Sequence, residues 1–160
     1  MLKHQEKQKL WELIKPIKTA MMCTQDGAQL RARPMQHLND QFDGTLLFFT
    51  DRTSHKVAEI SRTHEVCLSY ADPDETTFVS LSGLAELSHD QDQIDQHWNS
   101  FAEAWFPEGK DSQDVAILKV RITQAEYWDS PASKMVQLFE VAKANITDDT
   151  PDLGDNRKYG

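Results

Sequence analysis

The sequence lacks any apolar run near the roughly 20 residues that a membrane-spanning helix needs. Residues 1–7 are mostly polar, and no apolar signal-peptide core follows them. We therefore expect no membrane partner and a cytoplasmic location.

Cysteine and glycine are also scarce. Cys23 and Cys67 stand alone in apolar, strand-like surroundings without metal-type spacing, so we expect two buried, reduced thiols. The six glycines form no G-x-G-x-x-G or P-loop pattern, which leaves the usual nucleotide-binding folds unsupported. His89 and His97 have no third ligand at a usual spacing, so we expect no metal site.

Positive charge is in short supply, because 17 Lys and Arg face 26 Asp and Glu, for a net charge of −9. This balance argues against a nucleic-acid partner, whose binding depends on Lys and Arg neutralising phosphates. The scarcity makes one local cluster informative. Within residues 31–56 the chain carries six basic side chains, namely Arg31, Arg33, His37, Arg52, His55 and Lys56. A cationic cluster in an acidic chain indicates a small anionic ligand.

The second half of this cluster is predicted to be a strand that runs into a helix. Phe48 and Phe49 close an apolar run, and a short helix follows behind Thr53 or Ser54 as its cap. The unpaired N–H groups of a helix's first turn favour phosphate. After a Thr53 cap, the third helical position is Lys56, where a capping box would place Glu or Gln. The pattern therefore predicts a phosphate site at this helix start.

Hydrophobic periodicity divides the rest of the chain into short elements. It predicts helices at 5–15, 54–62, 91–105 and 134–145. It predicts strands at 17–24, 29–38, 45–50, 64–70, 77–87 and 115–122, with a shorter one at 125–128. Pro34 falls inside a predicted strand, which places that strand at a sheet edge or at a bulge.

The length of 160 residues indicates one domain, which we place at 1–146, followed by a polar, mobile C-terminal tail at 147–160. Six or seven strands joined by short turns, with helices between them, predict a mainly β (α+β) fold. We expect an antiparallel barrel rather than a wound parallel sheet.

Seven collinear motifs resemble the flavin-binding split-barrel superfamily typified by pyridoxamine 5′-phosphate oxidase, and more closely its general stress protein 26 branch. They cover roughly residues 5–143 and lie at 33–35, 48–50, 54–57, 68–73, 79–86, 104–111 and 126–131. The resemblance implies a six-stranded antiparallel split β-barrel with flanking helices. It also implies a homodimer that holds FMN, or alternatively FAD, in a groove between the subunits.

The same resemblance assigns roles to the cluster residues. Arg33, Ser54 and Lys56 would contact the FMN phosphate, a role that suits a guanidinium, a hydroxyl and an ammonium. The ribityl chain and the edge of the isoalloxazine ring would be lined by Phe49 and Thr50. Pro34 and Met35 complete the Arg33 motif. For Arg31 the sequence leaves a solvated and a ligand-binding role equally open.

Three further positions are implied at the flavin. Relatives commonly have Arg where this chain has His55, so one permanent charge becomes a titrating one. This exchange predicts a lower, pH-dependent FMN affinity. Trp128 matches a tryptophan near the flavin in the oxidase branch. Trp105 ends a predicted helix where a loop can reach a groove, although packing in the core or between subunits explains it as well.

The sequence contains no Ser-His-Asp, Cys-His or paired-carboxylate constellation, so any chemistry would be carried by the flavin. In the vitamin B6 oxidase an Arg-x-His segment follows the Glu-Phe-Trp motif. Here Glu126-Tyr127-Trp128 is followed by 129–135 without it, and no histidine occurs after His97. Pyridoxamine 5′-phosphate oxidation is thus disfavoured. Three alternatives stay open: an FMN-dependent oxidoreductase of unknown substrate, a flavin-binding or flavin-buffering stress protein without turnover, and a protein that takes another cofactor such as haem or a deazaflavin.

Overall fold

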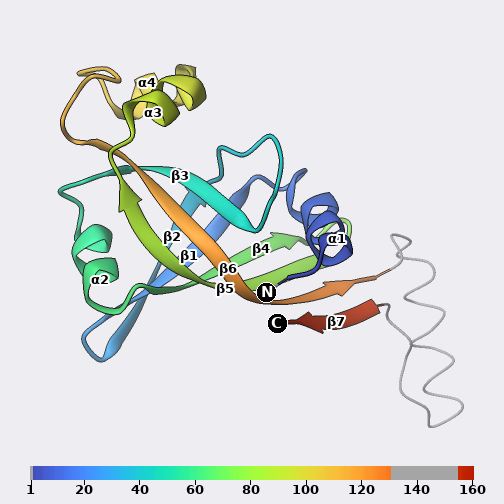
Figure 1. Cartoon of the computed structure of the whole chain (residues 1–160). Helices are drawn as coiled ribbons and strands as arrows, with labels where there is room; N and C mark the ends of the chain where they lie inside the picture. Colours follow the sequence, from blue (N-terminus) through green and yellow to red (C-terminus); the bar gives the residue numbers. More distant parts are fainter. Residues whose placement is uncertain (1, 131–154) are drawn as a thin grey trace, which may run out of the picture.

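Strands dominate the computed structural model, which describes residues 2–130 and 155–160 (Figure 1). The helices are α1 (His4–Ile14), α2 (His55–Thr63), α3 (Gln91–His97) and α4 (Ser100–Trp105). The strands are β1 (Thr19–Asp26), β2 (Gln29–Gln36), β3 (Thr45–Asp51), β4 (Glu65–Asp72), β5 (Thr77–Ser88), β6 (Val115–Asp129) and β7 (Asp155–Tyr159). In the described residues they form one antiparallel sheet in the order β2-β1-β4-β5-β6-β3, with β7 added beside β6.

The two ends of this strand order meet only at one point, which makes the sheet a split barrel. Just after β2, the N–H of Leu38 donates to the carbonyl of Leu47 on β3 at 2.8 Å. The Asn39 side chain also accepts from the Leu47 N–H at 2.8 Å and donates to the Thr45 carbonyl at 2.9 Å. The predicted split β-barrel with flanking helices is confirmed.

Pro34 lies on β2, which pairs only with β1 among the described strands. The β1–β2 register runs without a shift from Thr19 opposite Gln36 to Asp26 opposite Gln29. The proline is therefore tolerated because β2 is an edge strand, and the alternative of a bulge is excluded.

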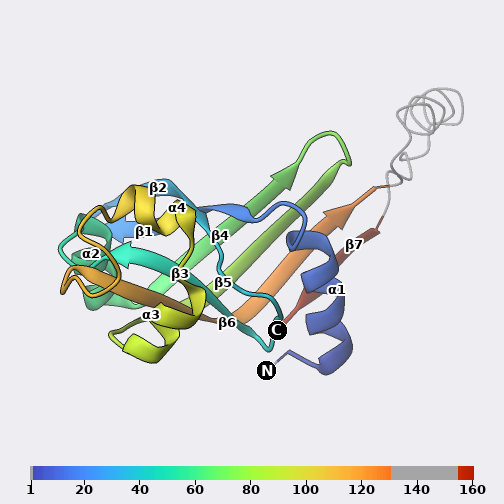
Figure 2. The same cartoon turned by 90° about the horizontal axis from the view of Figure 1, so that it is seen from above.

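Alternation along the strands builds the main core. Residues that point inward are fully buried on five strands, β1 and β3 to β6, and α1 adds Leu10 and Ile14 from one end of the barrel. The inward set includes Leu46, Phe48, Leu68, Tyr70, Val79, Leu81, Leu118 and Val120. Figures 1 and 2 place α1 and α2 at opposite ends of the barrel. The candidate functional site lies at the end that carries α2.

The predicted helix at 91–105 is two helices, α3 and α4, and the prediction of one continuous helix was wrong. Trp98 has extended backbone (ψ 133°), and the side chain of Asn99 accepts from the Ala102 N–H at 2.9 Å as the cap of α4. Asparagine competes with the helix for backbone groups, so it starts a new helix here. Because the helix breaks here, the Trp98 side chain packs in a second apolar cluster with Phe49, Phe106 and Ile117.

The strands predicted at 115–122 and 125–128 are one strand, β6. The register between β5 and β6 shifts once, between Ser82 and Gly83, and pairing continues on both sides of the shift. A Cβ on Gly83 would lie 2.7 Å from the carbonyl oxygen of Arg121, so only glycine allows the two backbones to approach this closely.

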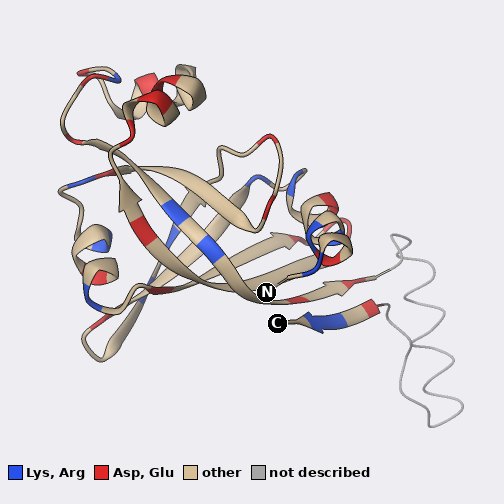
Figure 3. Cartoon of the chain, in the orientation of Figure 1, with Lys and Arg blue, Asp and Glu red and all other residues tan. Residues whose placement is uncertain are grey.

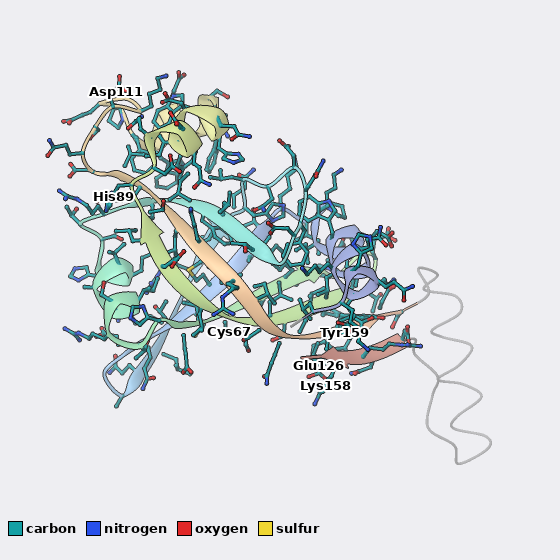
Figure 4. All side chains as sticks on the ribbon, viewed as in Figure 1. Cys67, His89, Asp111, Glu126, Lys158 and Tyr159 are labelled. Carbon is teal, nitrogen blue, oxygen red and sulfur yellow. The ribbon has the colours of Figure 1, made fainter. Side chains whose placement is uncertain are left out.

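The C-terminal residues 155–159 pair with β6 as β7, inside the range assigned to a polar tail from sequence. Figure 4 shows Lys158 beside Glu126 where the two strands run together, and their charged groups lie 3.4 Å apart. Tyr159 packs on Tyr127 with ring centroids 5.8 Å apart. The helix predicted at 134–145 lies outside the described residues.

The two cysteines are free thiols that face each other across β1 and β4. Both are half-buried rather than buried, because they point to the outer face of the sheet and not into the barrel. The prediction of buried thiols was therefore wrong about their depth.

Candidate functional site

Helix α2 begins at a turn that the preceding strand fixes. The Asp51 carboxylate accepts from the N–H of Thr53 at 2.7 Å and from its hydroxyl at 2.6 Å. The carbonyl of Asp51 accepts from the Ser54 N–H at 3.1 Å. Because Thr53 is held by Asp51, the helix cap is Ser54, and Lys56 becomes the second helical residue instead of the third.

The start of α2 leaves several donors without partners. The hydroxyl of Ser54 is buried, makes no capping bond and has no hydrogen-bond partner among the described residues. Within the same part of the chain the N–H groups of His55 and Lys56 donate to no backbone or side-chain acceptor. A buried polar group without a partner is costly and needs an explanation. The chemistry of this donor set fits an external oxyanion.

Arg33 reaches this end of the barrel from β2. Arg33 and Arg31 are cross-strand partners of Met22 and Thr24, so both face the same side of the sheet. Because β2 has no bulge, Arg31 lies on the same inward face of the strand as Arg33. The inward face of β2 thus changes from apolar at Met35 to cationic at Arg33 and Arg31 as the strand approaches α2.

The Arg33 guanidinium is held by two residues that sequence reasoning did not single out, Glu59 and Thr24. Its Nη1 and Nη2 donate to Oε2 of Glu59 at 3.1 and 3.0 Å, and Nη1 also donates to the Thr24 hydroxyl at 2.9 Å. That hydroxyl in turn donates to the same Oε2 of Glu59. The three side chains form a closed hydrogen-bonded triad that joins β1, β2 and α2.

Glu59 is buried, at 5% exposure, yet it stays ionised near neutral pH. The hydrogen bond from Thr24, followed by the hydrogen bond and charge of Arg33, holds the pKa of the Glu59 carboxyl below its usual range. The sequence carried one signal for this residue. Glu59 lies three positions after Lys56, which places both side chains on one side of α2.

Lys56 is half-buried beside Arg33. Burial, and then the positive charge of Arg33, lowers the pKa of the Lys56 ammonium. Figure 3 shows α2 carrying both basic and acidic residues at this end of the barrel. Arg33 and Lys56 therefore lie close together, with Lys56 two residues after the Ser54 cap and Glu59 as a buried counter-charge.

The other predicted residues of the two strands lie on different faces. Thr50 and Met35 are buried against the barrel interior, whereas Pro34 is exposed. Phe49 points to the opposite face of β3 from Thr50 and packs against Trp98 and Phe106, with ring centroids at 5.6 and 6.3 Å.

Trp105 and Trp128 do not join the α2 site within one subunit. Trp105 is 70% exposed, and its ring packs on Phe101 at 6.1 Å. Trp128 is 40% exposed and lies opposite Phe78, on a strand four places from β2 in the sheet. His55 is exposed at the first residue of α2, beside the unpaired donors.

His37 belongs to the core and not to the cationic cluster. Its Nδ1 lies 3.1 Å from the Tyr70 hydroxyl, and its ring packs on Trp11 at 5.3 Å between centroids. Burial, and then the charge of Lys18, lowers the pKa of His37 to about 4, so the ring is neutral at physiological pH.

The described residues show neither a metal centre nor a membrane-spanning helix. They contain no group of three or more His, Cys, Asp or Glu side chains arranged to hold a metal ion. None of the helices in residues 2–130 and 155–160 has the length and apolar character to cross a membrane.

Known proteins that resemble this chain in sequence or in structure point to one family. The sequence model described as pyridoxamine 5′-phosphate oxidase like matches residues 5–152. Protein bli-3 of Neurospora crassa is 26% identical over 141 residues, which cover 81% of this chain and 68% of bli-3.

Solved structures agree in fold over most of the chain. A general stress protein 26 from Jannaschia sp. CCS1 superposes with a TM-score of 0.76 and 26% identity, covering 95% of this chain and 96% of that one. The general stress FMN/FAD binding protein of Xanthomonas citri superposes with a TM-score of 0.71 and 26% identity, covering 82% and 93% of the two chains.

Proposed function

The chain belongs to the pyridoxamine 5′-phosphate oxidase like family, in its general stress protein 26 branch, and we propose that it binds FMN through its phosphate at the start of α2. The unpaired, buried hydroxyl of Ser54 carries the proposal. Ser54 caps the helix two residues before Lys56, and Lys56 lies close enough to Arg33 for their charges to interact. Hydroxyl, ammonium and guanidinium groups are the donors that a phosphate prefers.

The charge at the site favours FMN over FAD. The terminal phosphate of FMN is a monoester that carries between one and two negative charges near neutral pH. In FAD the same phosphate is part of a pyrophosphate and carries one. Arg33, Lys56 and Arg31 still outnumber the carboxylates of Glu59 and Asp51, so the more highly charged monoester gains more from this site.

A bound flavin supplies hydride and electron transfer, and the protein orients it. We propose a flavin-dependent oxidoreductase of unknown substrate, with a non-catalytic flavin-binding protein as the second candidate. Mixing the holoprotein with NADH or NADPH without oxygen separates the two. Bleaching of the flavin absorbance at a catalytically useful rate identifies a reductase, and an unchanged spectrum favours the binding protein.

We also propose a homodimer whose second subunit completes the flavin groove. Two observations support it: the separation of Trp128 from the α2 site within one subunit, and the exposed apolar side chains on the outer sheet face at Met21, Phe78 and Leu84. Light scattering should give twice the 18.3 kDa chain mass. A monomer that binds FMN with full affinity contradicts the shared groove.

A further inference from the structure

We infer that Glu59 is a positioning residue that fixes the Arg33 guanidinium so that one of its edges faces the start of α2. The inference rests on the proposed function, because it concerns the same phosphate site. Glu59 would act through Arg33 and would not touch the phosphate itself.

Arg33 has more N–H donors than its partners in the triad use. A guanidinium has five N–H donors in a rigid plane. The contacts within the triad all come from Nη1 and Nη2, which donate to the Thr24 hydroxyl and to Oε2 of Glu59. Within the described residues, the Nε–H and the second N–H of Nη2 have no partner. These two hydrogens lie side by side on one edge of the guanidinium, the arrangement that binds a phosphate with two parallel hydrogen bonds.

Glu59 also connects Arg33 to the helix that forms the rest of the site. It lies on the helix that also carries Ser54 and Lys56, and it is buried where it meets Arg33 from β2. The triad therefore ties the guanidinium to the same rigid element as the other two phosphate donors. Thr24, also buried, fixes the carboxylate from β1.

Arg33 and Lys56 repel each other, since the charge of Arg33 disfavours the charged form of Lys56. Two carboxylates, Asp51 first and then Glu59, favour that charged form. Glu59 is the carboxylate of the two that also bonds Arg33, so it lowers the cost of keeping both cations close before an anion arrives.

A purely electrostatic role for Glu59 predicts the opposite effect on FMN binding. If Glu59 acted only through its negative charge, it would repel the phosphate, and its removal would strengthen FMN binding. The two accounts therefore differ in the sign of the effect of a neutral, non-bonding substitution.

The experiment measures the affinities of FMN and riboflavin by calorimetry for the wild type, Glu59→Leu and Glu59→Gln. Riboflavin lacks the phosphate, so the ratio of the two Kd values isolates it. Glu59→Leu removes the acceptor and should lower the preference for FMN by about tenfold, with riboflavin affinity nearly unchanged. Glu59→Gln keeps an acceptor oxygen and should hold the preference at or above the wild-type value.

A double variant shows whether Glu59 acts through Arg33. In an Arg33→Met background, Glu59→Leu should leave the FMN preference unchanged, because the guanidinium it positions is gone. If Glu59→Leu unfolds the protein, Thr24→Val tests the same triad and should lower the preference in the same direction by about threefold.

Three results overturn the inference: a higher FMN preference in Glu59→Leu, an equal loss for both ligands, or additive losses in the double variant. A wild type that binds FMN no better than riboflavin, or binds neither, instead refutes the proposed function. The two failures are thus distinguishable.

Discussion

Arg33 and Lys56 come from separate elements, β2 and α2, yet they lie close together. Burial is the larger cause of the lowered pKa of Lys56, and the charge of Arg33 is the second. Two cations held together and half-buried, beside a hydroxyl without a partner, form a site built for an anion.

Replacing Lys56 should weaken FMN more than riboflavin. Lys56→Ala removes one charge-assisted contact, worth about 1.5–3 kcal/mol, or about ten- to a hundredfold in FMN affinity. Riboflavin has no phosphate and should lose little. Fluorescence quenching titrations measure both affinities.

Arg62→Ala is the matched control, because Arg62 is exposed in the last turn of the same helix and far from its start. It should leave both affinities near the wild-type values. Equal losses of FMN and riboflavin in Lys56→Ala would place Lys56 away from the phosphate.

The histidine at the first residue of α2 should make FMN binding depend on pH. A protonated imidazole attracts a phosphate and a neutral one does not, so such a contact weakens as pH rises. Ionisation of the phosphate acts in the opposite direction. His55→Arg keeps the charge, so it should bind FMN more tightly and retain its affinity at pH 8. Parallel pH profiles for the two proteins would mean that His55 does not face the phosphate.

His37 should make the folded protein less stable in acid. Its pKa is about 4 in the folded state, because burial and then Lys18 disfavour the charged form. The unfolded chain binds the proton at higher pH, so this stability is present above about pH 6.5. It is lost as pH falls, by about 3 kcal/mol between pH 7 and 4.

Urea unfolding at several pH values tests this. His37→Asn should give a flatter dependence of the unfolding free energy on pH over this range. His89→Asn, at an exposed histidine after β5, should follow the wild type (Figure 4). A His37→Asn profile that parallels the wild type would exclude His37 as the source.

Gly83 should not tolerate a side chain. In Gly83→Ala the new Cβ would meet the Arg121 carbonyl oxygen at 2.7 Å and a Val120 methyl at 2.8 Å, so β5 and β6 must shift apart. We expect a loss of about 1–3 kcal/mol in unfolding free energy. Ser82→Ala, at the exposed neighbouring residue, should cost far less. Equal thermal stability of the two variants would contradict the close approach.

The sequence predicted those parts of the site that depend on local order. A strand, a serine cap and a lysine follow each other at 48–56, so their proximity needs no knowledge of the fold. Arg33 came from the resemblance, and the barrel brings it to the same place. Glu59 escaped prediction because a glutamate on a short polar helix looks like an exposed residue, and only its packing against β1 and β2 shows its burial.

The elements that sequence reasoning misread were decided by tertiary contacts or by a single capping residue. Asn99 splits one amphipathic stretch into α3 and α4. Residues on both sides of the register shift pair with β5, so the two predicted strands are one strand, β6. The sequence hides this because the polar residues Thr123 and Gln124 interrupt the apolar pattern. Neither outcome can be read from hydrophobic periodicity alone.

The most direct test of the central claim is to map which backbone amides respond to the phosphate. Proton–nitrogen correlation spectra of the labelled protein are recorded with saturating FMN and with saturating riboflavin. We predict that the two spectra differ most at the amides of residues 54–57 and at Arg33. A folded protein that shows no change with FMN, or differences concentrated elsewhere in the barrel, would contradict a phosphate site at the start of α2.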